Sequence, residues 1–164
     1  MNLKNFLTTP LQRPLSKGLL IALFVVAALG FADATYLTVE HFLNSIPPCA
    51  IGGCETVLTS QYAEVAGIPV ALGGSVFYLL ILILLKIYFD RKNEKILRFA
   101  LSITIPAFLA TIYFFILQAF VTHAFCVYCL GSAFLALLIC IVASLLEPLG
   151  RSAVTPPPLP APES

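Results

Sequence analysis

Four long apolar segments decide what this chain of 164 residues can fold into. They cover residues 18–40, 69–89, 96–122 and 126–146, and each is bounded by charge, proline or glycine. A helix of roughly 20 apolar residues spans a hydrocarbon core of about 30 Å. Hydrophobic residues make up 60% of the chain and charged residues 10%, far from the balance of a soluble domain. The sequence therefore predicts an all-α membrane protein, a bundle of four transmembrane helices.

The first apolar segment is predicted to stay in the protein. Its apolar core is too long for a cleavable signal peptide, and His41, Asn44 and two prolines follow it where small residues would mark a cleavage site. We find no internal repeat and no second domain. The expected organisation is a cytoplasmic segment at 1–17, the membrane domain at 18–146 and a disordered, proline-rich tail at 147–164.

The cations orient the predicted bundle. All nine Lys and Arg residues lie before the first segment, around the turn between the second and third, or after the fourth. With four spans these regions share one face, which the positive-inside rule makes cytoplasmic together with both termini. The loops at 41–68 and 122–126 are then exoplasmic: periplasmic in a bacterial inner or plasma membrane, or lumenal in an ER membrane if the host is eukaryotic. A net charge of +1 indicates no nucleic-acid partner.

The first exoplasmic loop carries a cysteine pair. Two prolines stop any helix before Cys49, and two glycines let the chain bend between Cys49 and Cys54. Beyond this pair, Leu58, Tyr62 and Val65 recur at helical spacing between residues 55 and 66. We expect a short amphipathic helix there, lying at the membrane interface.

A second pair, Cys126 and Cys129, forms a CxxC motif where the fourth helix begins. Free N–H groups and the macrodipole at a helix N-terminus favour a thiolate, so Cys126 should ionise readily. Leu130 follows the motif in place of the His that c-type haem attachment requires. Both pairs are predicted on the exoplasmic face, where disulfides form and persist.

Three interpretations fit two cysteine pairs on one face. The loop pair alone is as consistent with a static disulfide as with a redox role. Four thiolates also suit a structural zinc ion, although such sites are commonest in reducing compartments, and we expect no metal. Two pairs in bendable segments favour thiol–disulfide exchange.

Several motifs, taken together, resemble the vitamin K epoxide reductase family over residues 18–146. They are the loop cysteine pair, the run Cys-Glu-Thr-Val-Leu-Thr-Ser that begins at Cys54, the Gly-Ile-Pro at 67–69 and the Phe-Cys-x-x-Cys that opens the fourth helix. The form resembled is the bacterial type, linked to quinone and disulfide formation. The chain ends before the thioredoxin-like domain that many bacterial members carry, so a separate thioredoxin-fold (DsbA-like) partner is expected.

The resemblance implies a four-helix bundle around a quinone. Cys126 and Cys129 would be the active-site pair beside the ring, and Cys49 and Cys54 the shuttle pair that receives electrons from a partner dithiol. The family pattern favours attack on Cys126 by Cys54, with Cys49 left for the partner. The same correspondence assigns six positions to the quinone pocket: Leu58, Ser60, Phe77, Phe114, Gln118 and Ala133. For the two phenylalanines, lipid-facing or core packing is the simpler interpretation.

Departures from the family pattern bear on the substrate. Vertebrate vitamin K reductases use an Asn and a Tyr to hold the substrate oxygens, where this chain has Val70 and Ala133. Ubiquinone or menaquinone is therefore expected, and vitamin K reduction in an ER-type membrane is the alternative. A DsbB-type protein performs the same reaction with the two cysteine motifs in the opposite order. A non-enzymatic membrane protein with structural disulfides is a further alternative.

Two other residues stand out within the apolar segments. Asp33 is an intramembrane carboxylate and thus a functional candidate. It could be a proton route or a structural partner of Tyr36 or Thr35, and we favour the structural interpretation. Pro106 should kink the third helix.

Overall fold

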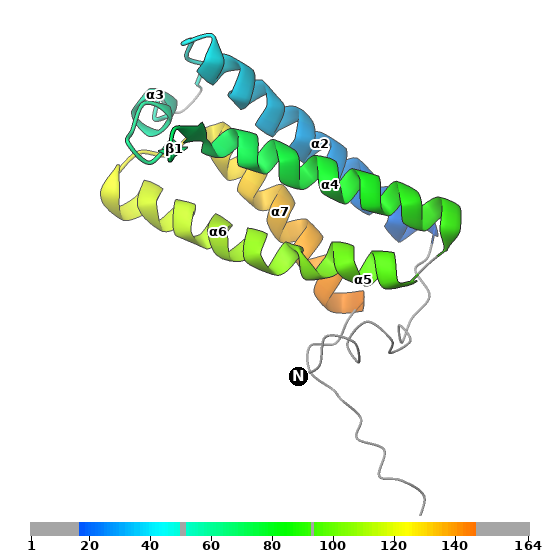
Figure 1. Cartoon of the computed structure of the whole chain (residues 1–164). Helices are drawn as coiled ribbons and strands as arrows, with labels where there is room; N and C mark the ends of the chain where they lie inside the picture. Colours follow the sequence, from blue (N-terminus) through cyan, green and yellow to red (C-terminus); the bar gives the residue numbers. More distant parts are fainter. Residues whose placement is uncertain (1–16, 50–51, 93, 147–164) are drawn as a thin grey trace, which may run out of the picture.

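The computed structural model describes residues 17–49, 52–92 and 94–146 (Figure 1). Four helical runs lie side by side: α2 (Lys17–Phe42), α4 (Val70–Arg91), a third run made of α5 (Glu94–Ser102), α6 (Thr104–Ile116) and the π-helix η1 (Leu117–Val121), and α7 (Val127–Leu146). The first three runs are long and apolar enough to cross a membrane, and the fourth contains a shorter apolar helix. The predicted all-α bundle is confirmed.

Small residues let α2 and α4 approach closely. The Gly30 Cα lies against the ring of Tyr78, where no Cβ would fit, and a Cβ on Gly74 would stand 3.5 Å from that of Ala34. Thr35 and Ser75 join the same two helices through their hydroxyl oxygens, which are 2.5 Å apart. Lipid is as apolar as leucine, so close packing and polar contacts of this kind hold membrane helices together.

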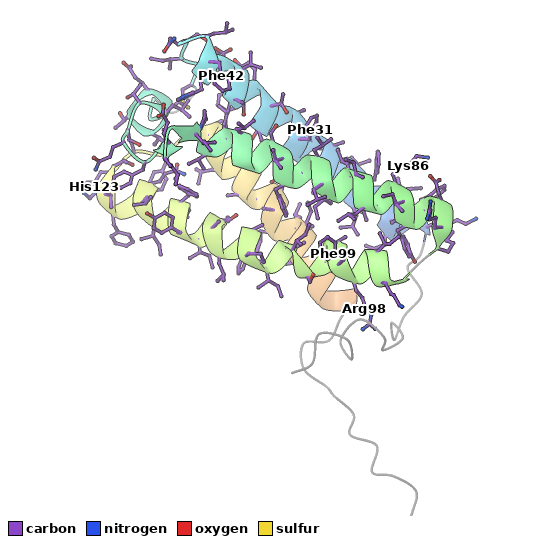
Figure 2. The ribbon with its side chains drawn as sticks, in the orientation of Figure 1. Phe31, Phe42, Lys86, Arg98, Phe99 and His123 are labelled. Carbon is purple, nitrogen blue, oxygen red and sulfur yellow. A yellow bond between two sulfur atoms is a disulfide. The ribbon has the colours of Figure 1, made fainter. Side chains whose placement is uncertain are left out.

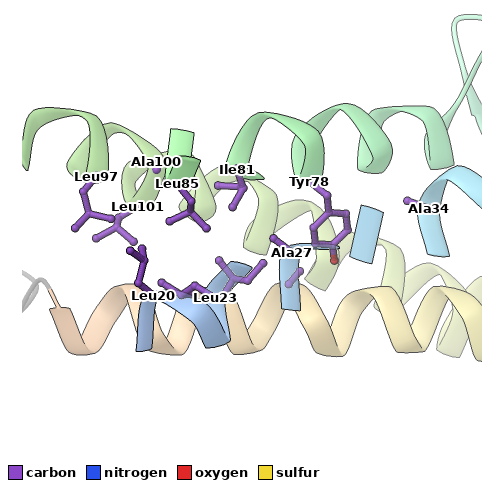
Figure 3. Close-up of a cluster of buried hydrophobic side chains, with 12 residues drawn as sticks. Leu20, Leu23, Ala27, Ala34, Tyr78, Ile81, Leu85, Leu97, Ala100 and Leu101 are labelled. Carbon is purple, nitrogen blue, oxygen red and sulfur yellow. The ribbon is translucent and has the colours of Figure 1, made fainter. Parts of the chain in front are cut away.

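The apolar side chains divide between a core and the outer surface. Figure 3 shows the buried cluster along the bundle axis, where Leu23, Ala27, Tyr78 and Ile81 are at most 3% exposed. Large apolar side chains also project outward, among them Phe42 and Phe99 (Figure 2). An apolar exterior of this extent suits lipid as the surrounding solvent.

The third run is broken where the sequence predicts a kink. Proline has no N–H, so the Pro106 backbone cannot bond the carbonyl of Ser102 four residues earlier. Helix α5 ends at Ser102, and α6 begins at Thr104. The hydroxyl of Thr104 donates to the carbonyl of Leu101 at 2.6 Å and stabilises the break.

The predicted interfacial helix at 55–66 is wrong in its extent. Helix α3 covers only Cys54–Leu58, and a two-stranded antiparallel hairpin of β1 (Glu64–Val65) and β2 (Ile68–Pro69) follows. Thr59 and Ser60 donate their hydroxyls to carbonyls inside α3, a local bond that competes with helix continuation. Ala66 and Gly67 both have positive φ, as a two-residue hairpin turn requires. Of the three apolar residues at helical spacing, only Leu58 therefore lies in a helix.

Two predicted segments fall outside the described residues. The cytoplasmic segment is described only at Lys17, and the proline-rich tail at 147–164 is not described. The domain boundaries given above remain predictions.

Candidate functional site

The loop cysteines are joined. Cys49 and Cys54 form a disulfide with their Cα atoms 5.9 Å apart. Cys54 opens α3 and is fully buried, whereas Cys49 is half-buried in the irregular segment before it. One sulfur of the pair is therefore accessible from outside the protein, and the other faces the interior.

Cys126 and Cys129 are thiols at the start of α7. Cys126 directly precedes the helix and is fully buried, and Cys129 lies in its first turn. The Cys129 N–H donates to the Cys126 sulfur at 3.4 Å. A hydrogen bond from the Cys129 thiol, helped by the N–H groups of Cys129 and Tyr128, lowers the pKa of Cys126 to about 7 against the opposing effect of burial. The predicted ease of ionising Cys126 is thus supported.

Gln118 holds Cys126 in place. Its side-chain Oε1 accepts the Cys126 N–H at 2.9 Å, and its backbone carbonyl accepts the N–H of Ala124 at 3.2 Å. Gln118 is buried in the π-helix η1, a distortion frequent at functional sites. The family resemblance assigned Gln118 to the quinone pocket, and its bond to Cys126 was not predicted. No local sequence pattern predicts that a side chain will accept a hydrogen bond from the backbone N–H eight residues later, as Gln118 does from Cys126.

Two backbone contacts bring the cysteine pairs together. The Tyr128 hydroxyl donates to the carbonyl of Pro48, the residue before Cys49, at 3.0 Å. The Cα of Gly53, the residue before Cys54, lies against the backbone of Phe125, so that no Cβ would fit. Each partner in these contacts is a sequence neighbour of a site cysteine. The loop disulfide therefore lies against the start of α7.

A cavity of about 690 Å³ opens beside the second pair. Its wall comes from α2, α4, α6, η1, α7 and the segment that holds α3 and the hairpin. The wall includes Cys129. All six positions that the resemblance assigned to a quinone pocket lie on this wall: Leu58, Ser60, Phe77, Phe114, Gln118 and Ala133. The volume falls in the range of small-molecule sites, and the wall is largely apolar.

A polar contact between side chains joins the hairpin to the end of α2. His41 Nε2 and Glu64 Oε1 are 3.0 Å apart, with His41 on the cavity wall. Tyr62 and Val65 line the cavity from the same segment. The segment after α3 therefore forms part of the cavity wall, although it is a hairpin and not the expected helix.

Tyr78 and Ser132 add polar groups that the sequence analysis did not single out. The Tyr78 hydroxyl donates to the Ser132 carbonyl at 2.6 Å and accepts from the Ser132 hydroxyl at 3.3 Å, and both residues line the cavity. Asp33 on α2 interacts electrostatically with Tyr78. It was expected to pair with Thr35 or Tyr36, but Thr35 bonds Ser75, and Asp33 Oδ2 is buried with no hydrogen-bond partner among the described residues.

Comparison with known proteins shows to which family this chain belongs. A model of the vitamin K epoxide reductase family matches residues 21–144. The chain belongs to the vitamin K epoxide reductase family. Members of this family use quinones in general. The family and the long apolar helices show that this chain is an integral membrane protein.

A plant protein is related to the chain. The thiol-disulfide oxidoreductase LTO1 of Arabidopsis thaliana is 32% identical over 114 residues, which cover 63% of this chain and 30% of the relative. This chain therefore matches less than a third of that relative's length. The family and this relative support thiol oxidoreductase chemistry in a membrane.

Proposed function

We propose that this protein is a quinone-dependent thiol–disulfide oxidoreductase. It takes two electrons from a reduced thioredoxin-fold (DsbA-like) protein, passes them through the two cysteine pairs and delivers them to a membrane quinone. The observation that carries the proposal is the arrangement of the pairs: the loop disulfide lies against the start of α7, and Cys129 of the second pair lines an apolar cavity.

The first exchange takes place at Cys49, the more accessible loop sulfur. A partner thiolate attacks Cys49, a mixed disulfide forms, and Cys54 leaves as a thiolate. The buried Cys54 then attacks Cys126 in the oxidised second pair and releases Cys129. The contact between Gly53 and Phe125 supports this order, because it holds the residues that precede the two reacting cysteines against each other.

Two further exchanges reset the loop. The second thiolate of the partner attacks the mixed disulfide at its own sulfur, leaves oxidised and frees Cys49. Cys49 then attacks Cys54 in the Cys54–Cys126 disulfide, which closes the loop disulfide and frees Cys126. The loop is oxidised again, and Cys126 and Cys129 hold the two electrons as thiols. The structure has this distribution of disulfide and thiols. A pKa of Cys126 near 7 suits its role as the leaving sulfur.

The cavity fits a quinone ring. Phe77 and Phe114 offer flat apolar walls, Leu58 and Ala133 add further apolar surface, and Ser60 and Gln118 supply polar groups. A bound quinone accepts two electrons and two protons. Cys129 is the thiol of the pair that lines the cavity, so it is the donor.

Two residues favour ubiquinone or menaquinone over a vitamin K epoxide. Val70 and Ala133 both line the cavity and are apolar where vertebrate vitamin K reductases carry oxygen-binding side chains. We propose that the cysteine pairs lie on the exoplasmic side. In support, they share one end of the bundle, and the described cations on α4 and α5 lie near the other end, as Figure 2 shows for Lys86 and Arg98.

The test is quinone reduction by the purified protein in detergent, with a reduced thioredoxin-fold protein as donor and ubiquinone or menaquinone as acceptor. The proposal predicts stoichiometric oxidation of donor dithiol and reduction of quinone. If neither quinone is reduced but vitamin K or its epoxide is, the vitamin K alternative replaces it. If no acceptor is reduced and mild dithiothreitol leaves the loop disulfide intact, the disulfide is structural and the proposal is wrong.

A further inference from the structure

Asp33 is a carboxylate in an apolar bundle with one oxygen unsatisfied. Its Oδ2 is buried and has no hydrogen-bond partner among the described residues. A polar group held this way costs free energy, and a carboxylate costs more unless it is protonated or paired. The packing of α2 does not require this group, because Gly30 and Ala34 make the close contacts with α4. Its position relative to the redox site indicates another role.

The packing of α2 against α7 places Asp33 at the depth of that site. The rings of Tyr36 on α2 and Tyr128 on α7 lie 5.6 Å apart, and the two helices run antiparallel (Figure 1). One helical turn inward from this contact brings α2 to Asp33 and α7 to Ser132, just beyond Cys129. Three titratable groups interact with the charge of Asp33. They are Tyr78 on α4, and Cys126 and Cys129 at the start of α7.

Two hydroxyl groups, those of Tyr78 and Ser132, lie between the level of Asp33 in the bundle and the cavity. Tyr78 reaches from α4 toward α7 (Figure 3) and exchanges hydrogen bonds with Ser132, and both line the cavity that holds Cys129 on its wall. A hydroxyl both donates and accepts, so it can pass a proton along. Asp33 does not line the cavity itself. Asp33 interacts electrostatically with Tyr78, which makes this pair the link to the cavity in the relay proposed below.

We propose that Asp33 accepts the thiol proton of Cys129 and returns it to the reduced quinone through the hydroxyls of Tyr78 and Ser132. The inference rests on the proposed function. In the reaction the S–H bond of Cys129 breaks, the Cys126–Cys129 disulfide forms, and two electrons pass to the quinone. One of the two protons that the quinone takes up comes from Cys129 by way of Asp33. The other comes from the solvent when Cys126 reacts as the thiolate, a form that its pKa of about 7 makes available near neutral pH. Asp33 is thus a proton-relay residue that acts through its neighbours.

The first readout uses no quinone. In a Cys126→Ala background the alkylation rate of Cys129 is followed between about pH 5 and about pH 9 by residue-resolved mass spectrometry. The proposal predicts two steps in this pH profile, because carboxylate and thiol titrate as a coupled pair. Adding Asp33→Asn should leave one step. Asp90→Asn is the matched control, since it removes an exposed carboxylate that pairs with Lys86 at the far end of α4, and its profile should keep both steps.

The second readout is quinone reduction by the pre-reduced full-length protein, with Cys126 and Cys129 both present. Asp33→Asn is expected to slow it by about 100-fold, the usual contribution of general acid–base catalysis. Asp33→Glu restores the transferable proton and should recover most of the rate, at least to about a tenth of wild type. Exchange between the loop disulfide and a small dithiol should be unchanged in both variants, which shows that they are folded.

The outcomes separate the relay from the oxidoreductase. A wild-type protein that reduces no quinone overturns the proposed function and this inference with it. A wild-type protein that reduces quinone, together with an Asp33→Asn protein of equal rate and an unchanged alkylation profile, overturns only the relay. A slow Asp33→Asn protein that Asp33→Glu does not rescue, with both profiles unchanged, would make Asp33 a packing residue and also overturn the relay.

Discussion

The two cysteine pairs differ in what holds them. Cys49 and Cys54 flank an irregular segment between α2 and α3, and only Cys54 is fully buried. Cys126 and Cys129 are fixed at the head of a 20-residue helix, with Gln118 bonded to the Cys126 backbone. In the proposed relay the loop pair meets a second protein and needs an exposed sulfur, whereas the pair on α7 meets a membrane-bound ring and needs a fixed position. The structure separates these two requirements.

Removing Cys129 should give the largest effect on this comparison. Cys129→Ala is expected to reduce quinone at no more than about a thousandth of the wild-type rate, because the proposed donor sulfur beside the cavity is lost. Stopped-flow absorbance of the quinone measures the rate. Cys140→Ala, which changes a cysteine deeper in the same helix, should keep wild-type activity. Equal loss in both variants would contradict a special place for Cys129.

The second largest effect is expected from a substitution that moves the two cysteine pairs apart and changes no cysteine. Gly53→Ala places a Cβ where the Phe125 backbone lies, so the loop must move away from α7. We expect exchange between the pairs to slow by about tenfold to a hundredfold, since misplacing reacting groups by about 1 Å costs that much. Rapid quench with alkylation measures the exchange. Gly131→Ala is the control, because its Cβ would meet no atom within 4 Å. Unchanged exchange in Gly53→Ala would break the proposed contact.

The acidity of Cys126 distinguishes the pairs in the reduced protein. Its pKa is lowered to about 7, chiefly by the Cys129 thiol, so its alkylation should be half-maximal near that pH. Thiolate is present above this pKa and is lost as the pH falls through it. In Cys129→Ala the donor is gone, and the half-maximal pH should rise toward that of an ordinary thiol near 9. An unshifted profile in that variant would assign the acidity to the helix terminus alone.

Loss of the Tyr128 hydroxyl should give the smallest effect. Tyr128→Phe removes the bond to the Pro48 carbonyl, worth about 1 kcal/mol, and should slow donor-driven turnover by a few-fold. Turnover with a small dithiol that reduces the second pair directly should not change. Tyr113→Phe, on an exposed residue of α6, serves as the control. A large loss with both donors would mean that Tyr128 supports α7 itself.

The sequence predicts best what a continuous local pattern encodes. Apolar length predicted the helices, proline chemistry predicted the break before Pro106, and the position of the CxxC motif predicted an acidic Cys126. The six cavity residues came from family resemblance, since nothing local distinguishes Phe77 from its neighbours. Helical spacing at 55–66 failed, because Thr59 and Ser60 bond back to the chain and Gly67 turns it into a hairpin.

Contacts between distant segments were beyond local patterns. Gly30 packing on Tyr78, Gln118 bonding Cys126 and Tyr128 bonding Pro48 each depend on how the helices come together. The unsatisfied Oδ2 of Asp33 is a feature of the same kind. The sequence marked the carboxylate, but only the packing of α2 against α4 and α7 leaves it without the expected partner.

The most direct test is a disulfide between the two pairs. A Cys49→Ala/Cys129→Ala protein keeps Cys54 and Cys126, and after mild oxidation the relay predicts a Cys54–Cys126 disulfide in most molecules, found by mass spectrometry. A Cys54→Ala/Cys129→Ala protein, which keeps Cys49 and Cys126, should form little. The reverse pattern would make Cys49 the inner cysteine. No disulfide in either protein would contradict electron transfer between the pairs.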